Sequence, residues 1–180
     1  VAKKAALLSQ SRNTPSIQAI RMVLHGRFPY LSYPRSYTAE DKKIAKESME
    51  KTGTSAYETA NVSELSGGQR QGIYLAMALA QDTSTVFMDE PTTYLDVKHQ
   101  LQVMQTAKEL AKAGKAVVLV LHDLPMALAG ADKIAVFEQG ELRACDTPEQ
   151  IYAQGILDEV FEVKVRCVET EDGRQYYCTM

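Results

Sequence analysis

The residues best suited to chemistry include a short glycine-containing segment, Leu65-Ser66-Gly67-Gly68-Gln69-Arg70-Gln71, which opens a long helical pattern. Two consecutive glycines let the backbone approach an anion closely, and the first turn of a helix presents N–H groups that have no intrahelical acceptor. With a Ser cap in front of it, such a turn suits a phosphate group. The same residues also fit a capped loop that binds nothing.

A second candidate is the acidic pair Asp89-Glu90, which follows the hydrophobic segment Thr85–Met88. Ligands of open parallel sheets bind beyond the carboxyl ends of the strands, so a pair of carboxylates at the end of a strand is well placed to meet one. Glu90 is the candidate general base, a group that takes a proton from water. The alternative is that the pair only caps the next helix.

Both segments resemble motifs of the ATP-binding cassette (ABC) ATPases. The heptapeptide resembles the signature sequence of that family, and Thr85–Thr92 resembles its Walker B strand. The resemblance implies that Asp89 holds Mg²⁺, directly or through water, and that Glu90 activates the water that attacks the γ-phosphate of ATP. It assigns nucleotide binding to four signature residues, Ser66, Gly67, Gly68 and Gln69.

Three shorter segments resemble further motifs in the family's order. Tyr94-Leu95-Asp96 resembles the D-loop, which assigns Asp96 to nucleotide binding. Val120-Leu121-His122-Asp123 resembles the switch-histidine motif, in which an imidazole hydrogen-bonds the γ-phosphate and helps to position the attacking water. Leu7-Leu8-Ser9-Gln10 resembles the Q-loop, whose Gln10 reaches Mg²⁺ or water.

The other two histidines, His25 and His99, have no such context and are interpreted as surface or packing residues.

The elements that position these motifs follow an α/β pattern. Short apolar runs at Val86–Met88, Val117–Leu121 and Ile134–Phe137 alternate with helical patterns, as buried parallel strands with crossover helices do. Between the first two runs, Asp96 is expected to cap a helix that stops at Gly114. The pattern therefore predicts a parallel α/β sheet with a right-handed βαβ unit. The resemblance to the ABC ATPases implies that this sheet belongs to a P-loop NTPase core.

A helical block precedes the second strand. Thr14-Pro15 is expected to open one helix, and Thr38 a second that ends at Gly53. We divide the chain into a Q-loop strand (1–13), a helical signature subdomain (14–80) and the C-terminal part of the α/β core (81–180). The last part is expected to turn at Gln139-Gly140 and to close with a hairpin at Asp172-Gly173.

Composition and charge limit the classes of protein that fit. The 180 residues are 45% hydrophobic and 24% charged, as in a globular domain, and the net charge of −3 does not indicate a nucleic-acid partner. Residues 1–60 carry net +5 and residues 61–180 net −8, so an anionic partner would meet the first third, unless this is only a solvated basic face.

The cysteines and the apolar runs indicate where the protein is found. Three cysteines without a C-x-x-C spacing indicate neither a disulfide framework nor a zinc site, and a reducing, cytosolic setting fits best. The longest apolar run, Ile73–Ala80, is too short to span a membrane, and no signal peptide is recognisable.

The chain departs from the ABC pattern in two places. Met77 stands in the signature helix where many members carry Arg. The larger departure is that no G-x-x-x-x-G-K-[ST] segment occurs, so the phosphate-binding loop is absent from these 180 residues. We therefore expect the chain to be a C-terminal fragment that lacks the Walker A region and is inactive by itself.

Three segments resemble one branch of the family, the importers of ferric siderophores, haem and cobalamin: Gly26–Leu31, Ser36–Asp41 and Leu95–Leu101. This resemblance implies an ATPase subunit at the cytoplasmic face of a bacterial membrane. Its expected partners are a second ATPase subunit in a head-to-tail dimer, membrane permease subunits and, indirectly, a solute-binding protein. ATP and Mg²⁺ are the expected cofactors.

Two other classes of function remain open at this point. One is a soluble ABC ATPase of DNA repair or translation, although the coiled-coil or zinc modules of the DNA-repair kind are not recognisable. The other is an interaction module that hydrolyses nothing, because the chain carries no phosphate-binding loop.

Overall fold

The computed structural model describes residues 1–9, 14–171 and 173–180, so the Q-loop residue Gln10 and the hairpin residue Asp172 lie outside the described residues. The chain forms two compact units, Val1–Val120 and Leu121–Met180. In the described part of the chain, no helix has both the length and the apolar character that crossing a membrane requires.

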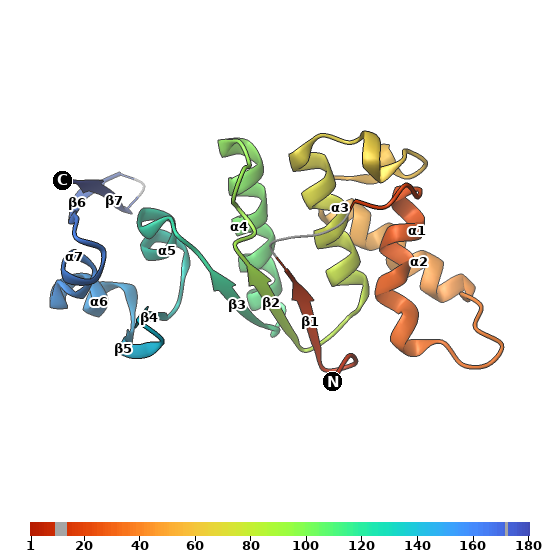
Figure 1. Ribbon diagram of the computed structural model, residues 1–180, viewed down its shortest axis with the longest axis horizontal. Helices are drawn as coiled ribbons and strands as arrows, with labels where there is room; N and C mark the ends of the chain where they lie inside the picture. Colours follow the sequence, from red (N-terminus) through yellow and green to blue (C-terminus); the bar gives the residue numbers. More distant parts are fainter. Residues whose placement is uncertain (10–13, 172) are drawn as a thin grey trace. The chain divides into compact units, whose positions relative to one another are not determined.

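The N-terminal unit contains three parallel strands, β1 (Ala5–Leu8), β2 (Thr85–Asp89) and β3 (Ala116–Val120), in that spatial order (Figure 1). Helix α4 (Val97–Lys112) connects β2 to β3. Asp96 caps this helix, and Gly114 follows it with φ +83°, a conformation that favours glycine. The predicted parallel sheet is confirmed.

The two faces of this sheet differ because side chains alternate along a strand. Leu8 and Met88 point into a core that they share with α3 and α4, and both are almost completely buried. On the other face Leu7, Phe87 and Val118 stand in register across the three strands, with 64%, 41% and 46% of their surfaces exposed. We call these three residues the open sheet face.

The described part of the chain between β1 and β2 is mainly helical (Figure 1). They are α1 (Ala19–Leu24), η1 (His25–Tyr30), α2 (Ala39–Lys51), η2 (Ser55–Tyr57), η3 (Val62–Glu64) and α3 (Gly67–Ala80). The apolar side of α3, with Ile73 and Leu75, packs in the same core as the buried side of the sheet. Helix α3 thereby connects the heptapeptide Leu65–Gln71, which we call the signature segment, to the strands.

Of the two helix starts predicted in this region, the structure confirms the second and not the first. Thr38 caps α2 through a reciprocal capping box with Asp41, and the helix ends at Lys51, close to the expected Gly53. The helix expected from Thr14-Pro15 begins only at Ala19. The prediction was wrong because the preceding residues pair with a distant segment: Gln18 forms a bridge with Asn61, and the N–H of Ala19 donates to Ala60.

A buried ion pair holds the helices together. Arg27 in η1 lies 3.0 Å from the Asp41 carboxylate, donates to the Ala80 carbonyl at the end of α3, and stacks on Tyr30 with 4.0 Å to the ring centroid. Burial opposes ionisation of Asp41, but hydrogen bonds from Thr38 and Arg27 outweigh it and keep its pKa below the ordinary value.

The C-terminal unit is built from two antiparallel strand pairs and three short helices. Its elements are α5 (Leu124–Gly130), β4 (Ile134–Glu138), β5 (Glu141–Asp146), α6 (Pro148–Gln154), α7 (Ile156–Phe161), β6 (Lys164–Thr170) and β7 (Gly173–Thr179). Strands β4 and β5 pair with each other, as do β6 and β7. A small core around Leu128, Val136 and Ile151 joins the helices to the strands.

One strand was predicted correctly in its position but with the wrong pairing partner and direction. The apolar run Ile134–Phe137 was expected as a third buried parallel strand, but β4 pairs antiparallel with β5. The reason is the turn: Gln139 and Gly140 both have positive φ, 50° and 85°, as a two-residue hairpin turn requires. A tight turn returns the chain antiparallel, whereas a parallel neighbour needs a crossover segment.

Candidate functional site

The signature segment forms the N-terminus of α3. Ser66 is the N-cap: its hydroxyl accepts from the Gln69 N–H at 3.3 Å, and the Gln69 side chain accepts from the Ser66 N–H at 3.0 Å. The Gln69 amide nitrogen also donates to the Tyr57 hydroxyl at 2.9 Å, which fixes the side chain against η2. Helix geometry leaves the N–H groups of Gly67 and Gly68 without intrahelical acceptors, so they remain suited to an anion.

The acidic pair lies at the carboxyl end of β2. Asp89 is the last residue of the strand and stands opposite Val120, the last residue of β3. No hydrogen bond or ion pair joins its carboxylate to the described residues. A single half-buried carboxylate fits a Mg²⁺ ion that takes its other ligands from water and substrate phosphates, and no cluster of three or more ligating side chains occurs among the described residues.

Glu90 has an unusual backbone conformation. Its φ is +45°, which is rare for a residue with a side chain, and its N–H donates to the Val120 carbonyl at 3.1 Å. Its carboxylate accepts a hydrogen bond from the Thr93 hydroxyl at 3.0 Å. These contacts fix the direction in which Glu90 leaves the strand, as a general base requires. Thr93 was not predicted from the sequence, because no local pattern marks it.

The D-loop residues join β2 to α4. Tyr94 has φ +62° and is almost completely exposed. The Asp96 carboxylate caps α4 by accepting from the N–H of His99 at 3.0 Å, and the same oxygen lies 2.7 Å from Nδ1 of the His99 ring. The backbone hydrogen bond and, after it, the ring keep the pKa of Asp96 below its ordinary value. Asp96, expected at the nucleotide, is thus engaged in the structure of its own helix.

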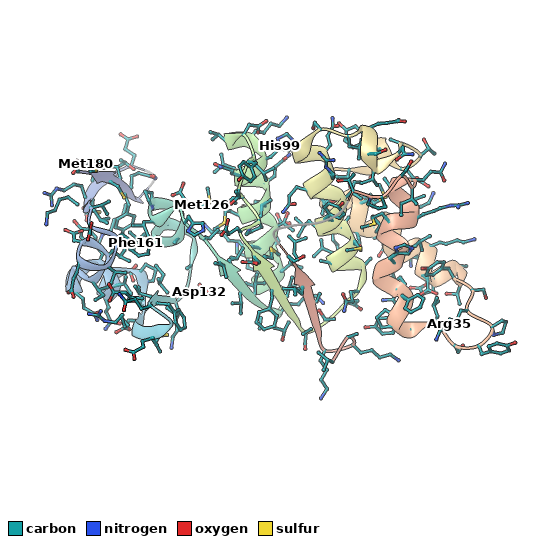
Figure 2. All side chains as sticks on the ribbon, viewed as in Figure 1. Arg35, His99, Met126, Asp132, Phe161 and Met180 are labelled. Atoms are coloured by element: carbon teal, nitrogen blue, oxygen red, sulfur yellow. The ribbon has the colours of Figure 1, made fainter. Side chains whose placement is uncertain are left out.

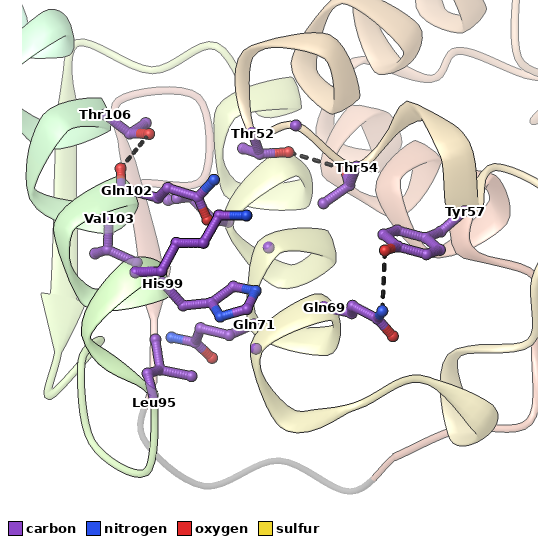
Figure 3. A pocket seen from close by; sticks show the side chains of 15 residues that line it. Thr52, Thr54, Tyr57, Gln69, Gln71, Leu95, His99, Gln102, Val103 and Thr106 are labelled. Carbon is purple, nitrogen blue, oxygen red and sulfur yellow. Dashed lines mark hydrogen bonds between the residues drawn. The ribbon is translucent and has the colours of Figure 1, made fainter.

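His99 was interpreted as a surface or packing residue, and its ring proves to lie between α4 and α3 (Figures 2 and 3). The site residues of the N-terminal unit are further joined by Gln71, whose side-chain amide in α3 donates to the Pro91 carbonyl at 3.0 Å. The signature helix therefore contacts the segment that follows the acidic pair.

Two predicted site residues lie outside the described part of the N-terminal unit. His122 is an exposed residue of the C-terminal unit, directly before Asp123, which caps α5. Gln10 lies outside the described residues. The N-terminal unit alone brings together the signature segment, the acidic pair and the D-loop.

A pocket of about 150 Å³ lies behind the signature segment, between α3, α4 and the turn after α2 (Figure 3). Its walls include Thr52, Tyr57, Gln69, His99 and Gln102. Pockets that bury a drug-sized ligand occupy about 300–1,000 Å³, so this one is too small for a nucleotide. The chemistry suggested by the motifs therefore lies at the outer surface of the signature segment and of β2, not in this pocket.

Comparison with known proteins identifies close relatives. The achromobactin transport ATP-binding protein of Dickeya dadantii strain 3937 is 36% identical over 170 residues, which are 93% of this chain and 63% of that protein. The iron(3+)-hydroxamate import ATP-binding protein of Bacillus subtilis strain 168 shows the same identity and coverage, 36%, 93% and 63%. The chain thus spans about six tenths of the length of these relatives.

Solved structures agree with the fold. A candidate metal-chelate type ABC transporter in an inward-facing conformation superposes with a TM-score of 0.87 at 20% identity, over 98% of this chain and 72% of that chain. The family model for ABC transporters matches residues 2–93, which include the signature segment and the acidic pair. This chain belongs to the ABC transporter family.

Proposed function

We propose that this chain supplies the signature segment, the acidic pair and the switch histidine of an ATP-hydrolysing transporter subunit. The observation that carries the proposal is the placement of Asp89 and Glu90 at the carboxyl end of β2, where parallel sheets bind their ligands. The contacts of Glu90 with Thr93 and Val120 give its carboxylate a fixed direction. The membership of this chain in the ABC transporter family supports ATP as the substrate.

In this proposal Glu90 takes the proton of the water that attacks the γ-phosphate. Asp89 would hold Mg²⁺, directly or through water, and the bound ion would supply positive charge next to the phosphate oxygens. His122 hydrogen-bonds the γ-phosphate, and Gln10 reaches the metal or the water. Proton removal and charge neutralisation together make hydrolysis possible at neutral pH.

The signature segment serves the nucleotide of a second subunit in a head-to-tail dimer. The N–H groups of Gly67 and Gly68 face the γ-phosphate of that nucleotide. The Ser66 hydroxyl accepts a hydrogen bond from Gln69 and still has its own hydrogen to donate to a phosphate oxygen. ATP binding closes the dimer, and hydrolysis opens it.

The proposed cargo is an iron chelate, that is, a ferric siderophore, with haem and cobalamin as the related alternatives. The names of the relatives, achromobactin transport and iron(3+)-hydroxamate import, support it. Membrane permease subunits would receive the motion of the dimer, a solute-binding protein would deliver the cargo, and the subunit would work at the cytoplasmic face of a bacterial membrane.

The test places these residues in a complete ATPase subunit, that is, one that includes a phosphate-binding loop. Glu90→Gln removes the base but keeps the shape of the side chain, so ATP should still bind and kcat should fall by about 10²-fold or more. Size exclusion with Mg-ATP should then show a dimer that persists, because hydrolysis no longer opens it.

Thr92→Val is the matched control, because this side chain is nearby and buried and, among the described residues, the hydroxyl that bonds Glu90 is that of Thr93. It should hydrolyse ATP at the parent rate. Hydrolysis by Glu90→Gln at the parent rate would show that Glu90 is not the base, and a parent subunit that binds no ATP would contradict the proposed function as a whole.

A further inference from the structure

The second glycine of the signature segment lies against a side chain from another helix. A Cβ atom placed on Gly68 would come within 2.8 Å of Cγ and Cδ2 of His99 and within 2.9 Å of its Nδ1. A Cβ on Gly67 would meet nothing within 4 Å. The two glycines therefore differ: the side of Gly68 where a Cβ would stand is covered by an imidazole, and the same side of Gly67 is open.

The same imidazole is bound to the D-loop. Its Nδ1 lies 2.7 Å from the Asp96 carboxylate oxygen that also caps α4. An ionised carboxylate only accepts hydrogen bonds, so Nδ1 carries the proton of this bond. The ring is thus held by Asp96 at one edge and packs on Gly68 with its atoms Cγ and Cδ2.

Two amide side chains reinforce this connection. Gln71 in α3 donates to the Pro91 carbonyl at 3.0 Å, and Gln100 in α4 donates to the Thr92 carbonyl at 3.3 Å. Both bonds end on the segment between the acidic pair and the D-loop. His99 adds a link of its own, from Asp96 of the D-loop to Gly68 of the signature segment.

We propose that His99 is a positioning residue that fixes the D-loop against the signature segment, so that both reach the facing subunit's nucleotide as one rigid surface. The ring makes this link through its hydrogen bond to Asp96 and its packing on Gly68. The expected effect of His99 on hydrolysis rests on the proposed function. The contacts of His99 with Asp96 and Gly68 do not depend on it, because they lie within one subunit.

The link is tested first without catalysis, by hydrogen–deuterium exchange in the complete, nucleotide-free subunit. His99→Ala should speed exchange in two segments at once, residues 66–70 and residues 94–99, because both lose the same contact. Gln102→Ala, one turn further along α4 and exposed in the same pocket, should speed exchange in neither. Faster exchange in only one of the two segments would overturn the inference.

The second test measures steady-state hydrolysis. His99→Ala should lower kcat roughly tenfold and leave KM within about twofold, because the signature segment and the D-loop serve the other subunit's nucleotide. His99→Asn keeps an N–H near the position of Nδ1 and should recover part of kcat, whereas Gln102→Ala should keep the parent kcat.

If kcat of His99→Ala equals that of the parent subunit, or if only KM changes, His99 does not have the positioning role. If the parent subunit itself does not hydrolyse ATP, the proposed function fails, and the exchange experiment still decides whether His99 links the two segments.

A double variant separates packing from hydrogen bonding. Gly68→Ala alone should speed exchange across residues 66–70, because its methyl group collides with the ring. In Gly68→Ala/His99→Ala the collision is gone, so the two effects should not add. Additive effects would show that His99 does not pack on Gly68 in solution.

Discussion

Two residues of the candidate site adopt backbone conformations that are rare for residues with side chains. Glu90 has φ +45° and Tyr94 has φ +62°, and both lie in the short segment between β2 and α4. Such conformations cost about 1–3 kcal/mol each and persist only where the surrounding contacts impose them. The hydrogen bonds of Glu90 to Val120 and Thr93 are contacts of this kind.

Thr93 gives the first prediction at the scale of single residues. Thr93→Val keeps the size and the β-branch but removes the hydroxyl that donates to Glu90. We expect kcat of the complete subunit to fall by about 3- to 10-fold, since Glu90, the proposed base, loses a fixed orientation worth about 1 kcal/mol, while ATP affinity stays at the parent value.

Thr93→Ser restores the hydroxyl and is the control for this prediction. It should return kcat to near the parent value in the same steady-state assay. Equal kcat values for the Val and Ser variants would contradict an orienting role for Thr93.

The residues of the site were predictable from the sequence to the extent that each belongs to a local motif. Ser66 before two glycines and Asp89-Glu90 after an apolar run are such motifs, and the structure places them at a helix start and a strand end. Thr93 and His99 were missed because their roles depend on contacts. The ring of His99 acquires its role only when α4 packs beside α3, which no spacing along the chain reveals.

At the scale of elements, the buried pair Arg27–Asp41 holds three helices in place, because Arg27 also binds the end of α3. Removing one partner of a buried pair leaves the other charge uncompensated. Asp41→Asn should therefore destabilise the complete subunit by about 3 kcal/mol at pH 7, measured by urea denaturation with circular dichroism. Glu47→Gln breaks the exposed pair with Lys43 and should cost less than about 1 kcal/mol.

The same pair predicts a pH dependence. Because the pKa of Asp41 is lower in the folded protein, its ionisation contributes stability above the ordinary carboxylate pKa, and this contribution is lost as the pH falls through the folded value. The stability difference between the parent and Asp41→Asn should therefore shrink below about pH 4. A difference that stays constant down to pH 3 would show that the charge of Asp41 does not stabilise the fold.

The elements were predictable where their signals are local. Caps at Thr38 and Asp96 are read from adjacent residues, and the structure contains both. The helix expected at Thr14 failed because Gln18 pairs with Asn61, far along the chain. The strand that begins at Ile134 was predicted to pair in parallel, which was wrong, because a short apolar run is compatible with either direction of pairing.

At the scale of the whole molecule, the open sheet face stands out. Leu7, Phe87 and Val118 lie side by side in register on a face that the described residues leave exposed. Contiguous apolar surface of this kind favours association, and within the described residues β1 and β3 each have one edge that pairs with no strand. The 180-residue chain is therefore expected to self-associate when it is purified by itself.

Substitutions on the open sheet face test this last prediction. Leu7→Thr/Val118→Thr keeps good strand formers and replaces apolar surface by hydroxyl groups, so light scattering should show a mass closer to that of one chain. Val168→Thr/Tyr177→Thr changes two apolar side chains of β6 and β7 in the C-terminal unit, each 47% exposed, and should leave association unchanged. An equal effect of both changes would mean that general hydrophobicity, and not the open sheet face, drives association. A parent chain that is already monomeric would rule out the association itself.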